Sequence, residues 1–467
     1  MNRNIFAKEN RGLIKIIIAL AWPTMLEQLM QTAVQYIDTA MVGSLGTYAT
    51  AAVGATSTVN WLLGSSTSAL AIGFLSYIAR ACGANDREAA RKSVSQAVLT
   101  VLVAGAFFTV VSLGLSPFVP KWMQVEASLQ ALSSQYFFIL YVPMIPRTAS
   151  IIFGTVLRAA GDTKTPMKIG VVMNVINVVL NYLFIYPTHM TALGFTVPGL
   201  GLGVIGAAIA SAISFTVGGI MITIVLWKHP MVSPKGQSIK PDMEILRPCL
   251  KVALPNMLQR FGTSLGYVAF ASMINSLGEI STAAHTIANT VESAFYIPGF
   301  GMQTAAATLA GNALGADDEK RMRDLASMFI PIEIILMIFS GGALFVLAPY
   351  LMRIFSQSSE VIDLGATVLR MVAVSEPFYG FSIIIEGMMQ GTGNTKQPFV
   401  YNILGMWAVR IVGTFICTQL LSLTLVAAWA CMIAHNLLIF VLYLISYLKG
   451  TWNPLTKARL AQERIAA

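Results

Sequence analysis

The sequence predicts an all-α membrane protein with twelve transmembrane helices in two six-helix bundles, related by a pseudo-twofold axis along the membrane normal. Two observations carry this prediction: an apolar composition and an internal repeat. Of the 467 residues, 56% are hydrophobic and only 11% are charged, and the mean hydropathy is +0.70. Soluble domains carry about 25% charged residues, and disordered chains have low hydrophobicity. The composition therefore excludes both classes.

Twelve apolar runs are long enough to cross a hydrocarbon core about 30 Å thick, which takes about 20 helical residues. They lack the alternating polarity of barrel strands, so we expect helices. The first run is too long for a signal peptide and contains Glu27 and Asp38, which indicates a retained helix. In chain order the predicted spans are 14–42, 47–79, 94–117, 127–157, 166–187, 201–227, 246–275, 281–311, 325–349, 361–390, 397–421 and 423–448.

The distribution of Lys and Arg predicts the orientation. With a cytoplasmic N-terminus, 24 of the 30 basic residues fall in cytoplasmic segments, as the positive-inside rule requires. Both termini are then cytoplasmic, in a multi-pass protein of the plasma or inner membrane. The net charge of +9 reflects this topology, so we expect contact with membrane lipid and no nucleic-acid partner.

The two halves of the chain repeat with an offset of 232 residues. Pro23 matches Pro255 and Gly46 matches Gly278, and near the end the offset becomes 220 because the first half has a longer loop at 187–203. Six helices in each half give both halves the same orientation, an arrangement found in transporters with a substrate site between the repeats. We expect an N-lobe (1–227), a cytoplasmic linker (228–245), and a C-lobe with a basic tail (246–467).

Several segments closely resemble motifs of the multidrug and toxic compound extrusion (MATE) transporters, and the likeness covers essentially the whole chain. The segments are Pro23 with Tyr36–Gly43, Leu157–Pro166, Asn177–Asn181 and Gln390–Lys396. The resemblance implies secondary active efflux of small, often cationic or amphipathic compounds by antiport with H+ or Na+, without a cofactor. We expect a monomer.

Within that family, the chain is more similar to the DinF-like branch than to the NorM-like branch. NorM-type members have acids in helices seven and ten, where this chain has Thr263 and Tyr379. Several prokaryotic members have Asp where this chain has Asn181. The resemblance therefore leaves Asp38 as the one ionised side chain in the first-lobe cluster, and it leaves the choice between H+ and Na+ open.

The residues themselves support a site around Asp38. A carboxylate inside a membrane span costs about 2.5–3.5 kcal/mol and is a functional-site hypothesis by default, although a hydrogen-bonded structural role is the alternative. Three asparagines of the fifth helix share one face, and their oxygens suit a hard cation. The predicted cation-binding or proton-coupling residues are Asp38, Asn177, Asn181 and Ser211, with Na+ at the first three; further cavity candidates are Asn174, Gln31, Tyr136 and Glu292, and Pro23 is the candidate hinge.

The proposed coupling is a competition. Ionised Asp38 holds the substrate-loading state, and protonation or Na+ capture removes that charge and changes the packing of the first helix. Glu333 and Glu386 are expected to be solvated near the cytoplasmic ends of their spans. Glu376, Arg147 and Arg410 are expected to satisfy one another or kinked backbone.

Other functions fit the sequence less well. A flippase or exporter of a lipid-linked or amphipathic precursor is the alternative, but such proteins often have extra helices and a strongly cationic cavity. An intramembrane enzyme is disfavoured because the sequence has no His-Glu-x-x-His motif. A channel is disfavoured by the parallel repeat.

Overall fold

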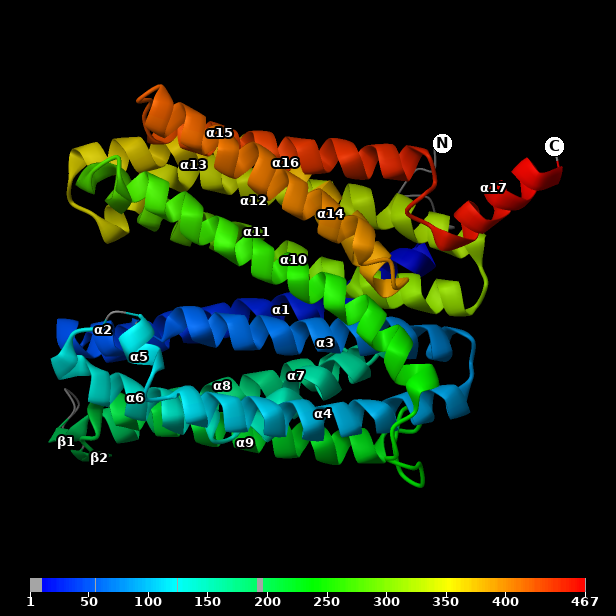
Figure 1. Ribbon diagram of the computed structural model, residues 1–467, viewed down its shortest axis with the longest axis horizontal. Helices are drawn as coiled ribbons and strands as arrows, with labels where there is room; N and C mark the ends of the chain where they lie inside the picture. Colours follow the sequence, from blue (N-terminus) through cyan, green and yellow to red (C-terminus); the bar gives the residue numbers. More distant parts are fainter. Residues whose placement is uncertain (1–10, 55, 124, 191–195, 467) are drawn as a thin grey trace. The chain divides into compact units, whose positions relative to one another are not determined.

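The computed structural model describes residues 11–54, 56–123, 125–190 and 196–466, and this part of the chain is nearly all helical (Figure 1). The helices of the first half are α1 (Arg11–Gly43), α2 (Thr47–Gly54), α3 (Ser57–Gly83), α4 (Arg87–Leu115), α5 (Val119–Trp122), α6 (Ala127–Tyr141), α7 (Met144–Ala159), α8 (Lys164–Ile185) and α9 (Gly203–Lys228). Those of the second half are α10 (Met243–Asn275), α11 (Glu279–Gly315), α12 (Glu319–Phe355), α13 (Ser359–Gly391), α14 (Lys396–Leu404), α15 (Val412–Phe415), α16 (Leu425–Leu448) and α17 (Pro454–Ala466), with π-helical segments η2 (Gly405–Ile411) and η3 (Ile416–Leu420).

Nine helical segments in the described residues are long and apolar enough to span a membrane, or ten if α6 and α7, bent by 51° at their junction, form one span. Two predicted spans fall outside this set. They are α10 and α11, with 33 and 37 residues, which are long enough but rich in polar side chains. The count of twelve spans in two bundles stays a prediction.

The internal repeat is visible in the helix boundaries. Equivalent starts at the offset of 232 are Thr47 and Glu279, Arg87 and Glu319, Ala127 and Ser359, and Lys164 and Lys396. The turns before α4 and α12 also match. Asn85 and Asp317 have φ of 59° and 53°, and the next residue in each half caps the helix: Asp86 accepts from the backbone N–H of Ala89, and Asp318 accepts from that of Arg321. The repeat is therefore confirmed in local structure.

The chain divides into two compact units. One contains residues 1–28, 75–85 and 250–467, and the other contains residues 29–74 and 86–249. The predicted lobe boundaries at 227 and 246 remain a prediction, because α1, α3 and α10 each contribute to both units. In the first unit, Ile17 and Ala21 of α1 join a core built from α11, α12, α13 and α16.

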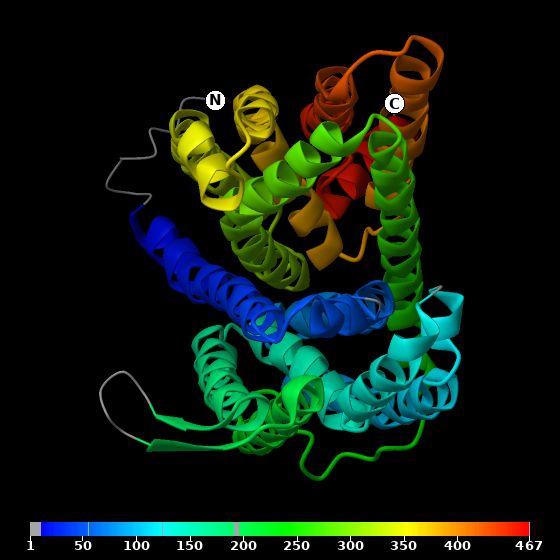
Figure 2. The same cartoon turned by 90° about the vertical axis from the view of Figure 1, so that its left-hand side faces the viewer.

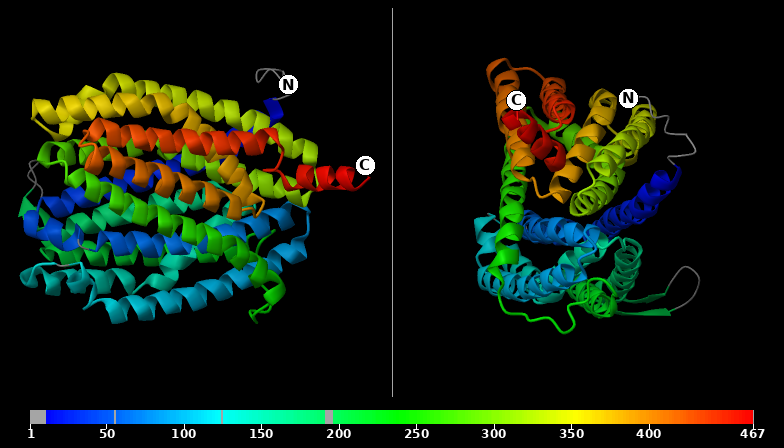
Figure 3. Two further views of the ribbon diagram at one scale, coloured as in Figure 1. Left: turned by 45° about the horizontal axis from the view of Figure 1, so that its top comes forward. Right: turned by 90° about the vertical axis from the view of Figure 1, so that its right-hand side faces the viewer.

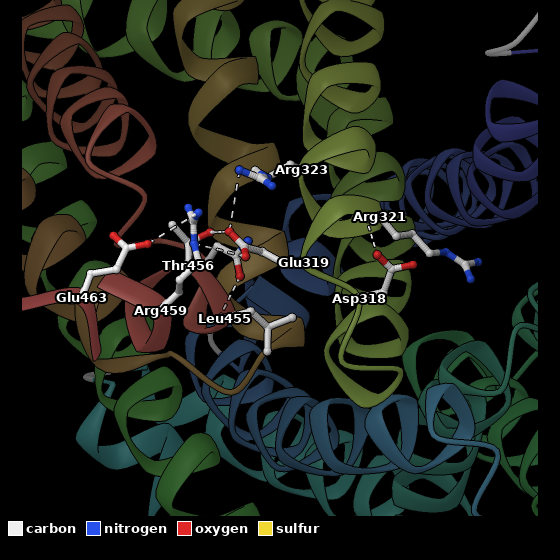
Figure 4. A network of polar contacts seen from close by, with 9 residues as sticks. Asp318, Glu319, Arg321, Arg323, Leu455, Thr456, Arg459 and Glu463 are labelled. Atoms are coloured by element: carbon white, nitrogen blue, oxygen red, sulfur yellow. Dashed lines mark hydrogen bonds and ion pairs between the residues drawn. The ribbon is translucent and has the colours of Figure 1, made fainter. Parts of the chain in front are cut away.

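Two features lie outside the predicted helices. The loop after α8 contains an antiparallel hairpin of β1 (Pro187–Met190) and β2 (Thr196–Leu200), which the sequence analysis missed and which projects beside α8 and α9 (Figure 2). The C-terminal tail forms α17, which continues beyond the end of α16 (Figure 3). Glu319 at the start of α12 accepts a hydrogen bond from Thr456 and pairs with Arg459 at 3.4 Å (Figure 4). These contacts tie the tail to α12.

Candidate ion-coupling site

The second unit contains a polar cluster where α1 meets α8. Asp38 lies near the end of α1, and its Oδ1 accepts a hydrogen bond of 2.6 Å from Asn181 Nδ2 on α8. Asn181 is 1% exposed and Asn177, one turn earlier, is 6% exposed, whereas Asp38 is half-buried. Hydrogen bonds to an ionised group are about twice as strong as neutral ones. The contact therefore joins a charged group on one helix to a buried amide on the other.

Asn177 connects this pair to α9. The amide oxygen and nitrogen of an asparagine are assigned from the hydrogen-bond network, and one orientation gives both Asp38 and Ser211 a matching role. In it, Asn177 Nδ2 donates to Asp38 Oδ1 at 2.8 Å, and the amide oxygen accepts from Ser211 Oγ at 3.2 Å. The structure thus brings together the four predicted coupling residues, from α1, α8 and α9. Their role in coupling stays a prediction.

The cluster has oxygen atoms available to a cation. Asn181 Oδ1 is buried and accepts no hydrogen bond from any described residue, and the Asp38 carboxylate lies beside it. Carboxylate and amide oxygens are ligands of hard cations, so this donor set suits Na+ as well as a proton. Within the described ranges, no three His, Cys, Asp or Glu side chains are grouped to hold a metal ion.

The further cavity candidates differ in their surroundings. Asn174 is half-buried on α8, and its Nδ2 has no hydrogen-bond partner in the described part of the chain. Gln31 is exposed on α1, and Tyr136 of α6 interacts electrostatically with Asp38. Glu292 belongs to the other unit and is 7% exposed. The structure therefore supports Tyr136 as a neighbour of Asp38 and assigns Glu292 to a separate environment.

An apolar pocket of about 890 Å³ lies in the same unit. The residues that line it are Met41, Val178, Val179, Tyr182, Leu183, Tyr186 and Pro187. None of the four cluster residues lines it, because the pocket residues of α8 lie on a different face of the helix from Asn177 and Asn181. Periodicity could have indicated the α8 face, but not the cavity.

Pro23 is buried inside α1 and belongs to the first unit. The next residue, Thr24, donates to the backbone oxygen of Ala21 at 2.8 Å and contacts that of Gly301 on α11 at the same distance. The proline removes one helix hydrogen bond, and the threonine side chain holds this part of α1 against α11.

Glu333 contradicts the sequence analysis. It was expected to be solvated, but its exposed fraction is 0%. The expectation was wrong because α11 and α13 both cover it: a Cβ placed on Gly299 would lie 2.6 Å from Glu333 Oε1, and one on Gly380 would lie 3.2 Å from Glu333 Cγ.

Glu386, also expected to be solvated, is half-buried and held by amides. Its Oε1 accepts from Gln259 at 2.8 Å and from Gln390 at 3.0 Å, and its Oε2 accepts from Asn402 at 3.3 Å. Gln390 lies one turn later on α13 itself, Asn402 comes from the following helix α14, and Gln259 comes from α10, 127 residues away. A carboxylate with three amide donors binds helices together.

Two intramembrane arginines, Arg410 and Arg147, lie over aromatic rings. Arg410 is 3% exposed, and its Cζ lies 4.1 Å from the centre of the Phe270 ring and 4.8 Å from that of Tyr267. Arg147 similarly lies 4.6 Å from the Phe215 ring and 5.3 Å from the Tyr141 ring. The partners of both guanidinium groups are therefore aromatic rings, whereas the sequence analysis expected Glu376 or kinked backbone in this role.

Comparison with known proteins adds a family relationship. A family model described as MatE matches residues 23–183 and 255–416, which together make up more than half of the chain. The probable multidrug resistance protein NorM of Thermotoga maritima is 26% identical over 451 residues, covering 97% of this chain and 95% of that protein. The probable multidrug resistance protein YoeA of Bacillus subtilis is 25% identical over 449 residues, covering 94% of each.

Solved structures have the same fold. A transporter of the MOP superfamily from Pyrococcus furiosus has a TM-score of 0.85 and 25% identity, covering 95% of this chain and 96% of that chain. A MATE crystal structure in the straight conformation has a TM-score of 0.86 and 25% identity, covering 95% of this chain and 97% of that chain.

Proposed function

The chain belongs to the MATE family of membrane transporters, and from this premise we propose that it exports small organic molecules in exchange for H+ or Na+. It is a transporter and not an enzyme. Relatives named as multidrug resistance proteins support drug-like substrates. We further propose that the substrates are cationic or amphipathic, because Asp38 is an acid within a membrane span and the same unit contains an apolar pocket.

The bond between Asn181 and Asp38 is the observation that carries the coupling proposal. An ionised Asp38 attracts a cationic substrate, and its charge is balanced by donors from α8. A proton or Na+ bound there removes that attraction. Because substrate and ion then favour different states of one side chain, ion entry drives substrate release.

Pro23 is the proposed hinge that transmits this change. Residues 11–28 of α1 belong to one compact unit and residues 29–43 to the other, and Pro23 precedes the division by about one and a half turns. A helix bends easily where a proline removes a backbone hydrogen bond. A change of charge at Asp38 can therefore alter the direction of its own segment of α1.

Three finer assignments are part of the same proposal. Both termini are cytoplasmic in the cell membrane, as the basic residues suggest, and the transporter works as a monomer. The coupling chemistry is that of the DinF-like branch, because the acid lies on α1, although a relative of this chain bears the name NorM. Flipping of a lipid-linked precursor remains the alternative.

Transport by Asp38→Asn in reconstituted vesicles is the decisive experiment. The vesicles receive a proton gradient or a sodium gradient, one at a time, and efflux of a fluorescent organic cation is followed. We expect one gradient to drive wild-type transport and the variant to lose it by about tenfold to a hundredfold, the loss that accompanies removal of a charged hydrogen-bonding group.

Glu360→Gln is the matched control, because it also neutralises an acid but at an exposed position at the start of α13. It should transport like the wild type. Gradient-driven efflux by Asp38→Asn at the wild-type rate would refute the assignment. Vesicles that flip a lipid-linked precursor but ignore organic cations would support the alternative function.

A further inference from the structure

Glu333 on α12 has the most unusual environment of the buried acids. Its exposed fraction is 0%, and neither carboxyl oxygen has a hydrogen-bond partner among the residues that the structure describes. Burial of an ionised carboxylate without a partner carries a penalty of several kcal/mol, and such groups neutralise instead. The packing around Glu333 therefore fits the protonated acid and not the carboxylate.

Two glycines make the space for this acid. Gly299 of α11 leaves room for Oε1, and Gly380 of α13 leaves room for the Cγ atom; a Cβ at either position would lie 2.6 Å and 3.2 Å from these atoms, respectively. Met337, one turn later on α12, packs against the same two glycines. The acid thus lies where three helices meet, and its position depends on their close approach.

The α11 side of this contact is a natural bending point. Pro298 interrupts the backbone hydrogen bonds of α11 immediately before Gly299. Ser340, on the same face of α12 as Glu333, donates to the backbone oxygen of Phe295 at 2.6 Å and so links α12 to α11 about one turn before Pro298. Movement of α11 at Pro298 would change the surroundings of Glu333 directly.

Other titratable groups surround the contact. Glu376 of α13 interacts electrostatically with both Glu333 and Glu292, and Glu292 of α11 in turn interacts with Arg410. Tyr296 of α11 and Tyr379 of α13 interact with Glu376. The remaining helices of this core carry Glu27 on α1 and His435 on α16. Two neighbouring acids resist simultaneous ionisation, so a proton on Glu333 also affects Glu376.

We propose that Glu333 is a second proton-binding site of this transporter, which holds its proton while α11, α12 and α13 are packed as here and releases it when the contact with Gly299 and Gly380 opens. This goes beyond the proposed function, because it adds a titrating group in the unit that lacks Asp38. The contact couples protonation to the bend at Pro298.

The direct test is infrared difference spectroscopy on the purified full-length protein in lipid, during a pH jump. The wild type should show the C=O stretching band of a protonated carboxylic acid that changes with pH, and Glu333→Gln should lack that band. Glutamine has the shape of the protonated acid, so we expect the variant to fold. Glu360→Gln, which alters an exposed acid, should keep the band.

The functional readout is the number of protons exchanged for each substrate, measured from the pH gradient that just balances an opposing substrate gradient. We expect Glu333→Gln to exchange one proton fewer than the wild type. Gly299→Ala is a second variant that keeps the acid but pushes a Cβ toward its oxygen. It should shift the pH at which the infrared band changes.

Wild-type spectra together with a wild-type proton count in Glu333→Gln would overturn the proposal, as would an unchanged band in Gly299→Ala. These outcomes are separate from those for the first site. Asp38→Asn should lose gradient-driven transport but retain the Glu333 band, so failure at one acid leaves the other testable.

Discussion

The two repeats use the same scaffold for opposite charges. In the first repeat, the contact between the first and fifth helices pairs the Asp38 carboxylate with Asn181. At the offset of 232, Asp38 corresponds to Phe270, and the fifth helix of the second repeat places the Arg410 guanidinium over that ring, at 4.1 Å from its centre. In our proposal, an ion or substrate binds to the charge at the first contact, whereas the charge at the second lies against aromatic rings.

The two charged side chains also differ in how far they are exposed. Asp38 is half-buried, whereas Arg410 is 3% exposed and lies among Phe270 and His285. A duplicated helix arrangement therefore does not imply duplicated chemistry. It follows that changes at the first contact should affect ion coupling, and changes at the second should affect stability.

Arg410→Gln should give the largest effect on stability. The substitution removes a buried cation–π stack and leaves Glu292 without its positive neighbour, which predicts a loss of about 2–4 kcal/mol in the free energy of unfolding. Thermal unfolding in detergent micelles measures it. Arg353→Gln is the control, because Arg353 is exposed and its Cζ lies 6.0 Å from the Tyr350 ring.

The control should lie within about 0.5 kcal/mol of the wild type. Surviving Arg410→Gln protein should keep the ion preference of the wild type. If Arg410→Gln unfolded at the wild-type temperature but had an altered ion preference, Arg410 would belong to the ion-coupling machinery and would not mainly stabilise the fold.

Asn181→Asp should change the preferred ion. A second carboxylate at 2.6 Å from the first cannot ionise fully without a cation between them, so we expect the Na+ concentration for half-maximal transport to fall by about tenfold, equivalent to about 1.4 kcal/mol. Transport at a series of Na+ concentrations and fixed pH gives this value.

The equivalent position in the second repeat, Gly413, offers a matched control. A Cβ there would contact Cys431 Sγ at 3.1 Å and no charged atom, so Gly413→Ala should leave the Na+ dependence unchanged. Should Asn181→Asp respond to Na+ no differently from the wild type, the cluster would not be the cation site.

The sequence predicted the contact between Asp38 and Asn181 better than that between Arg410 and Phe270, because periodicity shows which residues share a helix face. Asn177 and Asn181 are one turn apart, and a lone acid on the first helix pointed to the same region. The repeat likewise predicted the helix starts and the matched caps at Asp86 and Asp318. These are local properties, and local sequence determines them.

Glu333 shows why the rest could not be predicted. Its position near a helix end suggested solvent, but its burial depends on Gly299 and Gly380, which are 34 and 47 residues away in the chain. Two of the amide partners of Glu386 also come from other helices. Contacts of this kind depend on how helices pack, which a single sequence without aligned relatives does not specify.

The smallest predicted effect concerns the contact between Ser211 and Asn177. Ser211→Ala removes the hydroxyl that contacts Asn177 at 3.2 Å, and one neutral hydrogen bond contributes about 1 kcal/mol, or about fivefold in ion affinity. Cys431→Ala at the equivalent position removes only a thiol whose Sγ lies 3.8 Å from Cys417 Sγ. The first variant should raise the ion concentration needed for half-maximal transport, and the second should not. Equal effects from the two would mean that Ser211 merely packs, as Cys431 does, and the site would end at Asn177.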